Sequence, residues 1–447
     1  MTSVPQPPSS WQPSTRALHD GIDARIRATG VPGLHPTDPT VMHDLMGSDA
    51  MAAWQEGKEA NAFLGETCWS ELPTVYARYG TDEARALIRA LKGLYGAKGA
   101  IVTDCGASAV AFAIDALVTP GSHAILCRQI YGKTRAHLEW TAQRVSAQIT
   151  LVDHLDAATL HAEVRPETKL VMAETYSNPL TRAVDPDAVS TAANALRAER
   201  APDLRIVLDD TVATPWGPAR SLLSYDGIDV VVSAGTKAVV GQDRDTLGYL
   251  VSNRIGFLNI VMDLQAMRGG TLSWRAAASI VRDLAQAAAL HATRCATATQ
   301  VAAFLATRAD VESVLHPSRP DHVDAEVIAR AYARPGSLMA FRVRDLDEAG
   351  HRHLTDVIAM TKVIRYALSF DGLVTKVNHH TTVSEYFTPA PRLRRQGIDR
   401  LVRLAVGTED PQDLIAALAW ALDHHRQVSV EHVKDWQATR KVELGLS

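Results

Sequence analysis

Lys237 and Asp209 are the residues whose type and spacing most directly suggest chemistry. Asp209 follows the largely apolar residues 204–208, and Lys237 comes 28 positions later, shortly after the apolar residues 228–232. Each run predicts a buried strand, and open α/β sheets bind ligands at the carboxyl ends of their strands. There, a lysine offers a reactive amine and an aspartate can hold a cationic group. Taken singly, such residues more often lie in solvent or cap the next helix.

Other predicted strands end in residues suited to a ligand site. Gly106 separates a short strand from a helix that begins with small residues, and a helix start of this kind binds anions through free N–H groups. Asn178 precedes a proline after another strand, which favours a turn that can aim its amide at a ligand. Tyr131 follows a third strand, although a tyrosine more often serves packing. Together these residues would suit a flat cofactor with a phosphate, a ring nitrogen and an aldehyde.

The elements that must position these residues alternate between strand and helix. Apolar runs predict strands at residues 100–103, 124–127, 149–152, 170–173, 204–209, 228–232 and 247–251. Helical spacing and helix-ending residues predict helices at about 84–94, 107–117 and 186–200, with another between residues 152 and 170. This alternation is typical of an α/β fold with a mostly parallel sheet covered on both faces.

The pattern changes after residue 251. Residues 255–268 and 275–307 look helical, and the second helix is long enough to bridge two domains. A loop at residues 317–320 marks a boundary, and later strands are expected near 337–343, 363–368 and 401–406, before a final helix at 411–425. We therefore expect an N-terminal arm at 1–75 that contributes to subunit contacts, a large domain at 76–310 and a smaller α+β domain at 311–447.

Composition narrows the classes of protein. A chain of 447 residues with 46% hydrophobic and 21% charged residues fits a globular protein of two or more domains. A net charge of -4 without a basic run argues against nucleic-acid binding, and the lack of an apolar run of eighteen residues argues against a membrane span. The Pro- and Ser-rich start does not resemble a secretory signal.

Cysteine and histidine usage points to a reducing compartment and no metal site. The spacing of the four cysteines fits neither a zinc site nor a disulfide framework, which favours the cytoplasm; they are Cys68, Cys105, Cys127 and Cys295. Cys127 lies in an apolar run and is expected in the core. Among the 17 histidines, adjacent pairs do not suggest metal ligands.

Four segments in one order resemble a known family. Residues 76–80 (Tyr-Ala-Arg-Tyr-Gly) resemble its Tyr-x-Arg-x-Gly segment, and residues 174–180 resemble Glu-x-Pro-Ser-Asn-Pro. Residues 208–211 are similar to Val-Asp-Asn-Thr, and residues 403–410 match Arg-x-Ser-x-Gly-x-Glu-Asp closely. The chain thus resembles the pyridoxal 5'-phosphate (PLP) enzymes of cysteine and methionine metabolism, the transsulfuration family of cystathionine γ-synthase and γ-lyase. The resemblance implies the fold-type-I PLP-dependent transferase fold, which is like that of aspartate aminotransferase.

The resemblance also implies catalytic roles. Lys237 would form the internal Schiff base and then move protons, and Asp209 would pair with the pyridinium nitrogen so that the ring acts as an electron sink. Tyr131 would stack on the ring as a third catalytic residue, and Asn178 would contact the ring oxygen. Arg403 would bind the substrate carboxylate with its bidentate fork, assisted by Ser369.

The remaining implied roles concern the cofactor. Within the subunit, the cofactor-binding residues would include Thr211, and the N–H groups of Gly106 and Ala107 would hold the phosphate together with Thr236. Tyr76 and Arg78 would reach the phosphate of a neighbouring subunit, which implies a homo-oligomer, either a dimer or a dimer of dimers.

The chain departs from the family pattern mainly around the substrate. Ala234 replaces a phosphate-binding Ser, Ala107 replaces Met and widens the space near the phosphate, and Asp210 replaces Asn. Asp210 is expected to make local hydrogen bonds rather than to act as a catalyst. Lys133 occupies a position that varies among subgroups, and residues 370–372 (Phe-Asp-Gly) replace Leu-Gly-Gly. We therefore expect the cofactor chemistry to be retained on an unusual substrate or acceptor.

The implied function is γ-elimination or γ-replacement on an amino acid with a Cγ leaving group, through a vinylglycine-type intermediate. Substrates of the homoserine-ester, cystathionine, methionine or S-adenosylmethionine type fit, with a second, nucleophilic substrate in the replacement case, and the departures suggest specialised biosynthesis. The alternatives are a β-eliminating or other PLP lyase on the same fold, and a non-catalytic protein with a PLP fold. Loss of the lysine or the aspartate would mark the last of these, and both residues are present.

Overall fold

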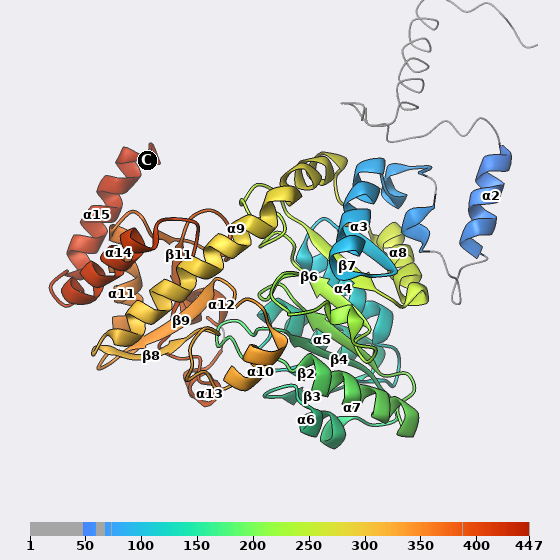
Figure 1. The fold of residues 1–447 in the computed structure, drawn as a ribbon, viewed down its shortest axis with the longest axis horizontal. Helices are drawn as coiled ribbons and strands as arrows, with labels where there is room; N and C mark the ends of the chain where they lie inside the picture. The colour runs from blue at the N-terminus through green and yellow to red at the C-terminus, as the bar shows by residue number, and fades with distance from the viewer. Residues whose placement is uncertain (1–47, 60–67, 73, 387, 447) are drawn as a thin grey trace, which may run out of the picture.

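A computed structural model describes residues 48–59, 68–72, 74–386 and 388–446. They form two β-sheets, each with its own helices, and the long helix α9 (Trp274–Thr307) runs from one to the other (Figure 1). The Pro- and Ser-rich start and most of the arm expected at residues 1–75 lie outside the described residues. Within the described residues, no helix has both the length and the hydropathy needed to cross a membrane.

The first sheet has seven strands in the order β1-β7-β6-β5-β4-β2-β3. Strands β6, β5, β4, β2 and β3 are parallel, whereas β7 runs antiparallel to both β6 and β1. The strands are β1 (Gly99–Thr103), β2 (His123–Cys127), β3 (Gln148–Val152), β4 (Thr168–Glu174), β5 (Arg205–Asp209), β6 (Val230–Ser233) and β7 (Gly248–Ser252). All seven predicted strands are present, and the expected α/β class with a mostly parallel sheet is confirmed.

Helices cover both faces of this sheet. They are α3 (Asp82–Tyr95), α4 (Gly106–Leu117), α5 (Gly132–Val145), α6 (Ala157–Glu163), α7 (Pro186–Glu199) and α8 (Ile255–Arg268). Three short 3-10 helices and one N-terminal helix complete this half: η1 (Trp69–Glu71), η2 (Ala77–Tyr79), η3 (Leu222–Ser224) and α2 (Ser48–Glu59).

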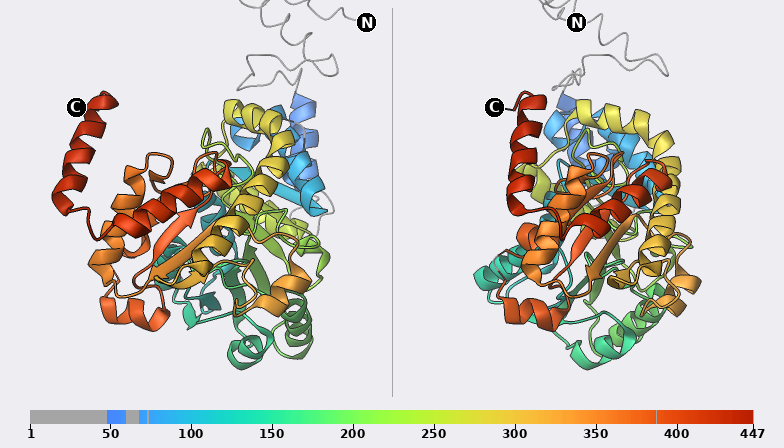
Figure 2. Two further views of the ribbon diagram at one scale, coloured as in Figure 1. Left: turned by 60° about the vertical axis from the view of Figure 1, so that its left-hand side comes forward. Right: turned by 90° about the vertical axis from the view of Figure 1, so that its left-hand side faces the viewer.

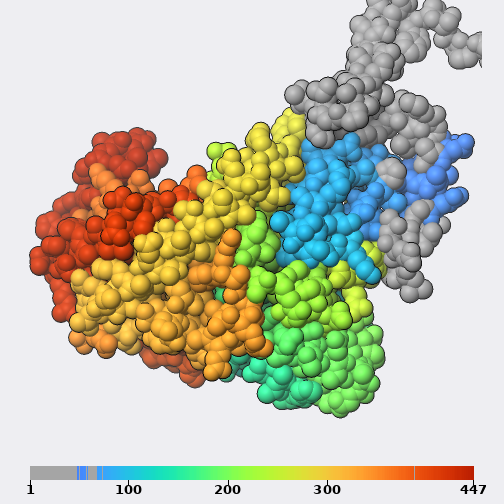
Figure 3. Space-filling view, in the orientation of Figure 1, coloured from blue at the N-terminus to red at the C-terminus, as the bar shows by residue number. Residues whose placement is uncertain are grey.

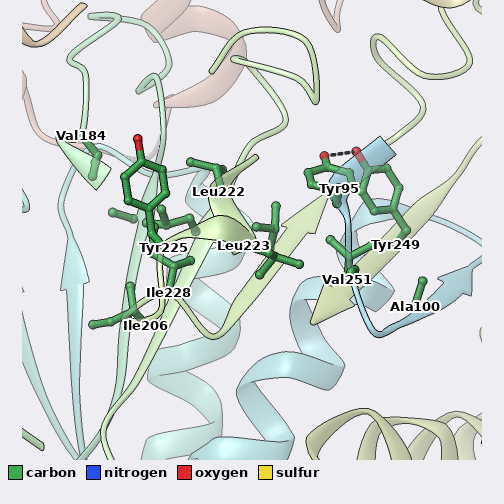
Figure 4. Packing of buried hydrophobic residues seen from close by; sticks show 14 of the residues in the cluster. Tyr95, Ala100, Val184, Ile206, Leu222, Leu223, Tyr225, Ile228, Tyr249 and Val251 are labelled. Carbon is green, nitrogen blue, oxygen red and sulfur yellow. Dashed lines mark hydrogen bonds between the residues drawn. The ribbon is translucent and has the colours of Figure 1, made fainter. Parts of the chain in front are cut away.

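Alternating side chains of the strands build a core on each face. In β5, Ile206 joins the core that includes Leu87 of α3 and Leu196 of α7, whereas the next residue, Val207, joins the core that includes Leu258 of α8. Figure 4 shows part of the first core around Ile206, with the hydroxyl groups of two buried tyrosines in contact. Two apolar faces explain why the strands read as continuous apolar runs in the sequence.

The second sheet has five strands in the order β10-β11-β12-β9-β8. These strands are β8 (Val311–Leu315), β9 (Leu338–Val343), β10 (Arg365–Tyr366), β11 (Lys376–His379) and β12 (Val402–Ala405). The helices of this half are α10 (Ala325–Ala331), α11 (Glu348–Met360), α12 (His380–Ser384), α13 (Ala390–Gln396), α14 (Pro411–His424) and α15 (Val430–Glu443). The expectation that the helix at 411–425 is the last one was wrong, because α15 follows it.

Helix α9 connects the two halves. It packs against α3 beside the first sheet and against α14 and β8 of the second. Figure 3 shows it in yellow, crossing the surface between the orange and red C-terminal half and the blue and green N-terminal half. In the left view of Figure 2, α15 stands at the edge of the molecule, away from the first sheet. Strand β8 already belongs to the second sheet, so this sheet begins before the loop at residues 317–320.

Candidate active site

A cavity of about 810 Å³ opens at the carboxyl ends of the parallel strands. Its lining includes residues from both sheets and brings together nearly all of the predicted site residues. The predicted residues that line it are Gly106, Ala107, Tyr131, Asn178, Asp209, Thr211, Thr236, Lys237, Ser369 and Arg403. Ser369 and Arg403 come from the half of the chain that holds the second sheet, and they meet the edge of the first sheet in this cavity.

Lys237 lies in the turn after β6, with its backbone N–H donating to Ala234 O. Its Nζ donates to Ser369 Oγ at 2.6 Å and lies 5.3 Å from the centre of the Phe370 ring. Burial lowers the pKa of the Lys237 ammonium, partly opposed by the negative charge of Asp371. A lowered pKa increases the fraction of neutral amine, which is the nucleophilic and basic form.

Asp209 and Glu174 end neighbouring parallel strands in register with each other. Asp209 is buried, and its Oδ1 accepts hydrogen bonds from the backbone N–H and the hydroxyl of Thr211. Burial raises the pKa of both carboxyls, and the nearby Asp209 charge helps raise the pKa of Glu174 to about 8. Two buried carboxyls this close favour a cation beside one of them, and the ring nitrogen of a pyridinium is such a cation.

Glu174 is a residue whose role the sequence alone did not indicate. Its Oε1 accepts from the backbone N–H of Tyr131 and its Oε2 from that of Asn178, both at 2.9 Å. One side chain therefore holds the two loops that present Tyr131 and Asn178 to the cavity. The signal was present in the sequence, since Glu174 ends a strand just as Asp209 does, but only the sheet order places the two side by side.

The start of α4 forms the expected anion cradle. No side chain caps this helix, because Cys105 at the N-cap position makes no capping hydrogen bond. Gly106 is required by packing, since a Cβ there would lie 2.3 Å from the Cβ of Ala234. Free N–H groups of a helix start at the cavity wall fit a phosphate.

Thr211 and Thr236 already have backbone partners. The Thr211 hydroxyl donates to Asp209 and accepts from Ala234 N–H at 2.8 Å, so it links the carboxylate to the turn before Lys237. The Thr236 hydroxyl donates to Leu247 O and accepts from Leu247 N–H. Thr236 could donate to a phosphate only if its hydrogen turned away from Leu247.

Arg403 lies on β12 and is buried. Its Nη2 donates to Ser369 O at 3.0 Å and its Nη1 to Asn178 Oδ1 at 3.4 Å, whereas its buried Nε has no hydrogen-bond partner within the described residues. Burial lowers the pKa of Arg403 to about 10, which still leaves it charged at neutral pH. A buried cation with unused donors at a cavity wall suits a carboxylate ligand.

Tyr76 and Arg78 do not line this cavity. Tyr76 is 41% exposed, and Arg78 donates to Ala266 O while its guanidinium stacks on the rings of Tyr76 and Tyr79. Within one subunit, these two residues thus lie apart from the other predicted site residues.

Comparison with known proteins identifies the family. Residues 59–423 match the family described as Cys/Met metabolism PLP-dependent enzyme. The chain belongs to this family. It is 29% identical to the L-methionine gamma-lyase of Porphyromonas gingivalis over 92% of this chain and 96% of that protein. It is also 29% identical to the cystathionine gamma-synthase of Mycobacterium bovis, with the same coverage.

A solved structure supports the fold. The cystathionine gamma synthase of Xanthomonas oryzae pv. oryzae superposes with a TM-score of 0.76 at 23% identity, covering 94% of this chain and 100% of that one. The cofactor of this family is PLP, and the residues of the cavity fit it, with an uncapped helix start for the phosphate, a buried carboxylate for the ring nitrogen and a lysine amine. The chain is a PLP-dependent enzyme of the cystathionine γ-synthase type.

Further residues line the cavity without having been predicted as part of the site. They include Cys105, Ser108, His137, Thr246, Val383 and Tyr386. The last two lie in and just after the five-residue helix α12, which is too short to give a periodic signal. His137 lies four residues after Lys133, on the same face of α5, but no motif of the sequence singled it out.

Proposed function

We propose that this enzyme catalyses γ-elimination or γ-replacement on an amino acid with a leaving group at Cγ. The observation that carries the proposal is the single cavity in which Asp209, Lys237 and Arg403 meet. The relatives named methionine gamma-lyase and cystathionine gamma-synthase both act at the γ position, as their names state. This reaction class needs a base that serves more than one carbon, and Lys237 is placed for that work.

Each residue of the site has its own role in this proposal. Bound PLP withdraws electrons from the substrate, so that protons at Cα and Cβ become acidic. Lys237 Nζ accepts and returns these protons, and Arg403 binds the α-carboxylate and orients the substrate. Asp209 would keep the ring nitrogen protonated, with its carboxylate oriented by Thr211.

The remaining cofactor contacts come from the loops at the same edge. The N–H groups of Gly106 and Ala107, with Thr236, would hold the phosphate. Tyr131 would pack on the ring, and Asn178 would donate its side-chain amide to the ring oxygen. Glu174 keeps these last two loops in place through its bonds to their N–H groups.

Lys133 bears on the choice of substrate. It lines the cavity, and its ammonium makes no hydrogen bond or ion pair within the described residues. An unpaired cation among the lining residues of the cavity favours a leaving group or acceptor with a negative charge and disfavours a sulfonium. A homoserine ester of a dicarboxylic acid or a cystathionine-type substrate therefore fits better than one of the S-adenosylmethionine type.

We also propose a homo-oligomer, a dimer or dimer of dimers, in which Tyr76 and Arg78 of one subunit reach the phosphate of the next. Neither residue lines the cavity of its own subunit and Tyr76 is partly exposed, which supports this arrangement. A reducing, cytoplasmic location is supported by four cysteines that are all free thiols.

The test is incubation of the purified protein with amino acids that carry leaving groups at Cβ or Cγ, in deuterated water. We expect visible absorption from bound cofactor, turnover of Cγ-substituted substrates and deuterium exchange at Cβ. The Lys237→Ala variant should lose turnover and exchange, whereas Lys98→Ala, at an exposed position, should retain both. Pyruvate from Cβ-substituted substrates with no exchange at Cβ from any Cγ-substituted one would refute the proposal and favour β-elimination.

A further inference from the structure

Residues Ser369 to Gly372 form a turn of unusual backbone conformation. Ser369, Asp371 and Gly372 have φ values of 74°, 56° and 92°. A Cβ at Gly372 would lie 2.0 Å from Asp243 Oδ2, so this position also requires glycine for space. Because non-glycine residues rarely adopt such φ values, the surroundings must hold the turn in shape.

One side of this turn faces the cavity. Ser369 Oγ accepts from Lys237 Nζ, and Ser369 O accepts from Arg403 Nη2. A single residue therefore contacts both the reactive amine and the guanidinium proposed to bind the substrate carboxylate. Any shift of the turn would change the distance between these two groups.

The other side of the turn is held by buried charges. Asp371 is 2% exposed, accepts a hydrogen bond from the Ser337 hydroxyl and lies 3.6 Å from Arg294 Nε. Arg294, on α9, is completely buried, and its Nη1 donates to Gly241 O and Gly372 O, each at 3.2 Å. Arg294 therefore ties the turn to the segment that follows Lys237.

Lys376 makes a second tie between the same two segments. Its Nζ donates to the backbone oxygen of Asp371 and pairs with Asp243 Oδ2 at 2.7 Å. Two buried cations thus hold this turn: Arg294 faces the Asp371 carboxylate, and Lys376 holds the Asp371 backbone oxygen. The carboxylate stands where the family pattern has glycine. Removing that carboxylate would leave the completely buried Arg294 without its counter-charge, which is costly.

We propose that Asp371 is a positioning residue, which holds the turn through Arg294 and Ser337 and thereby sets Ser369 against Lys237 and Arg403. The inference rests on the roles of Lys237 and Arg403 in the proposed function. It differs from those roles because Asp371 itself touches neither the substrate nor the cofactor. The charges around Lys237 also support this positioning role. Asp371 and Asp243 raise the pKa of the Lys237 ammonium, whereas Arg403 and Lys376 lower it.

The test is the Asp371→Asn variant of the full-length holoenzyme. Asparagine tolerates the left-handed backbone and keeps the shape of the side chain but removes the charge. We expect KM for the amino acid to rise roughly tenfold with a smaller change in kcat, as the loss of a charged hydrogen bond predicts. The pH midpoint of the absorption of bound cofactor should also move to lower pH, because a nearby cation loses a counter-charge. The matched control is Asp345→Asn, at an exposed aspartate with a similar φ of 58°. It should change neither KM nor the pH midpoint.

A double-mutant cycle with Arg294→Met separates positioning from general damage. If Asp371 acts through Arg294, Arg294→Met should raise KM less in the Asp371→Asn protein than in the native one. Additive effects, or an unchanged KM and midpoint in Asp371→Asn, would overturn the inference. If Asp371→Asn does not fold, Ser337→Ala removes one hydrogen bond to the turn but leaves the charge of Asp371. This variant should raise KM and leave the pH midpoint in place, and an unchanged KM would count against the positioning role.

Measurements on the native protein distinguish a failure of this inference from a failure of the proposed function. If native enzyme binds cofactor and turns over a Cγ-substituted amino acid while Asp371→Asn behaves like it, only the role of Asp371 fails. If native enzyme shows neither cofactor absorption nor turnover, the proposed function fails and this inference fails with it.

Discussion

Asp210 gives a stability prediction whose sign follows directly from the structure. This residue is completely buried directly after Asp209, and the Tyr95 hydroxyl donates to its Oδ2. Its Oδ1 has no hydrogen-bond partner within the described residues. Burial raises the pKa of this carboxyl from 3.8 to about 7, with Tyr95 opposing the rise and the charge of Asp209 adding to it. The expected local hydrogen-bonding role is confirmed, but burying this carboxyl lowers the stability of the folded protein.

The cost depends on pH because the folded protein prefers the protonated acid. An unfolded chain ionises Asp210 near pH 3.8, so folding is penalised once the pH exceeds that value, and the penalty grows until the folded group ionises near pH 7. A shift of about three pKa units corresponds to about 4 kcal/mol at pH 8 and about 2 kcal/mol at pH 5. Asparagine is always neutral and can still accept from Tyr95. Asp210→Asn should therefore raise the free energy of unfolding, and by about 2 kcal/mol more at pH 8 than at pH 5.

The assay is urea unfolding of native and variant holoenzyme at one protein concentration between pH 5 and pH 8. The control Asp226→Asn replaces an exposed aspartate and should show no such pH dependence. A gain that is equal at pH 5 and pH 8 would refute the pKa argument. A variant less stable than native at pH 8 would show that the carboxylate is needed in its ionised form.

Two further substitutions test the site directly. Arg403→Lys replaces a planar fork with a point charge and should raise KM for the amino acid about 10- to 100-fold with a smaller effect on kcat, measured by steady-state kinetics; an unchanged KM would contradict carboxylate binding. Gly106→Ala should weaken cofactor binding at least about tenfold in an equilibrium titration, since the new Cβ forces α4 away from Ala234. Its control is Gly93→Ala, an exposed helical site with no atom within 4 Å of the new Cβ, and equal affinities of the two variants would count against the cradle.

Much of the fold was predictable because the information is local. Six of the seven strands of the first sheet are buried at nearly every position, the edge strand β3 being the exception, so they read as apolar runs. Residues such as Asp209 and Lys237 stand at or just after strand ends. Strand β11 was missed for the opposite reason. Its residues, Lys376 to His379, include three polar side chains that are buried against other polar groups rather than in an apolar core.

The sequence by itself determined the type of sheet, the cofactor and the residues that can serve it, because strand periodicity and short motifs depend on neighbours along the chain. Only the tertiary structure decided which distant groups meet. Glu174 comes beside Asp209 through the order of the strands, and Asp371 meets Arg294 across 77 positions because α9 passes beneath the turn that it holds. Such contacts depend on how whole elements pack and on the cost of leaving a buried charge alone, and neither leaves a local pattern in the sequence.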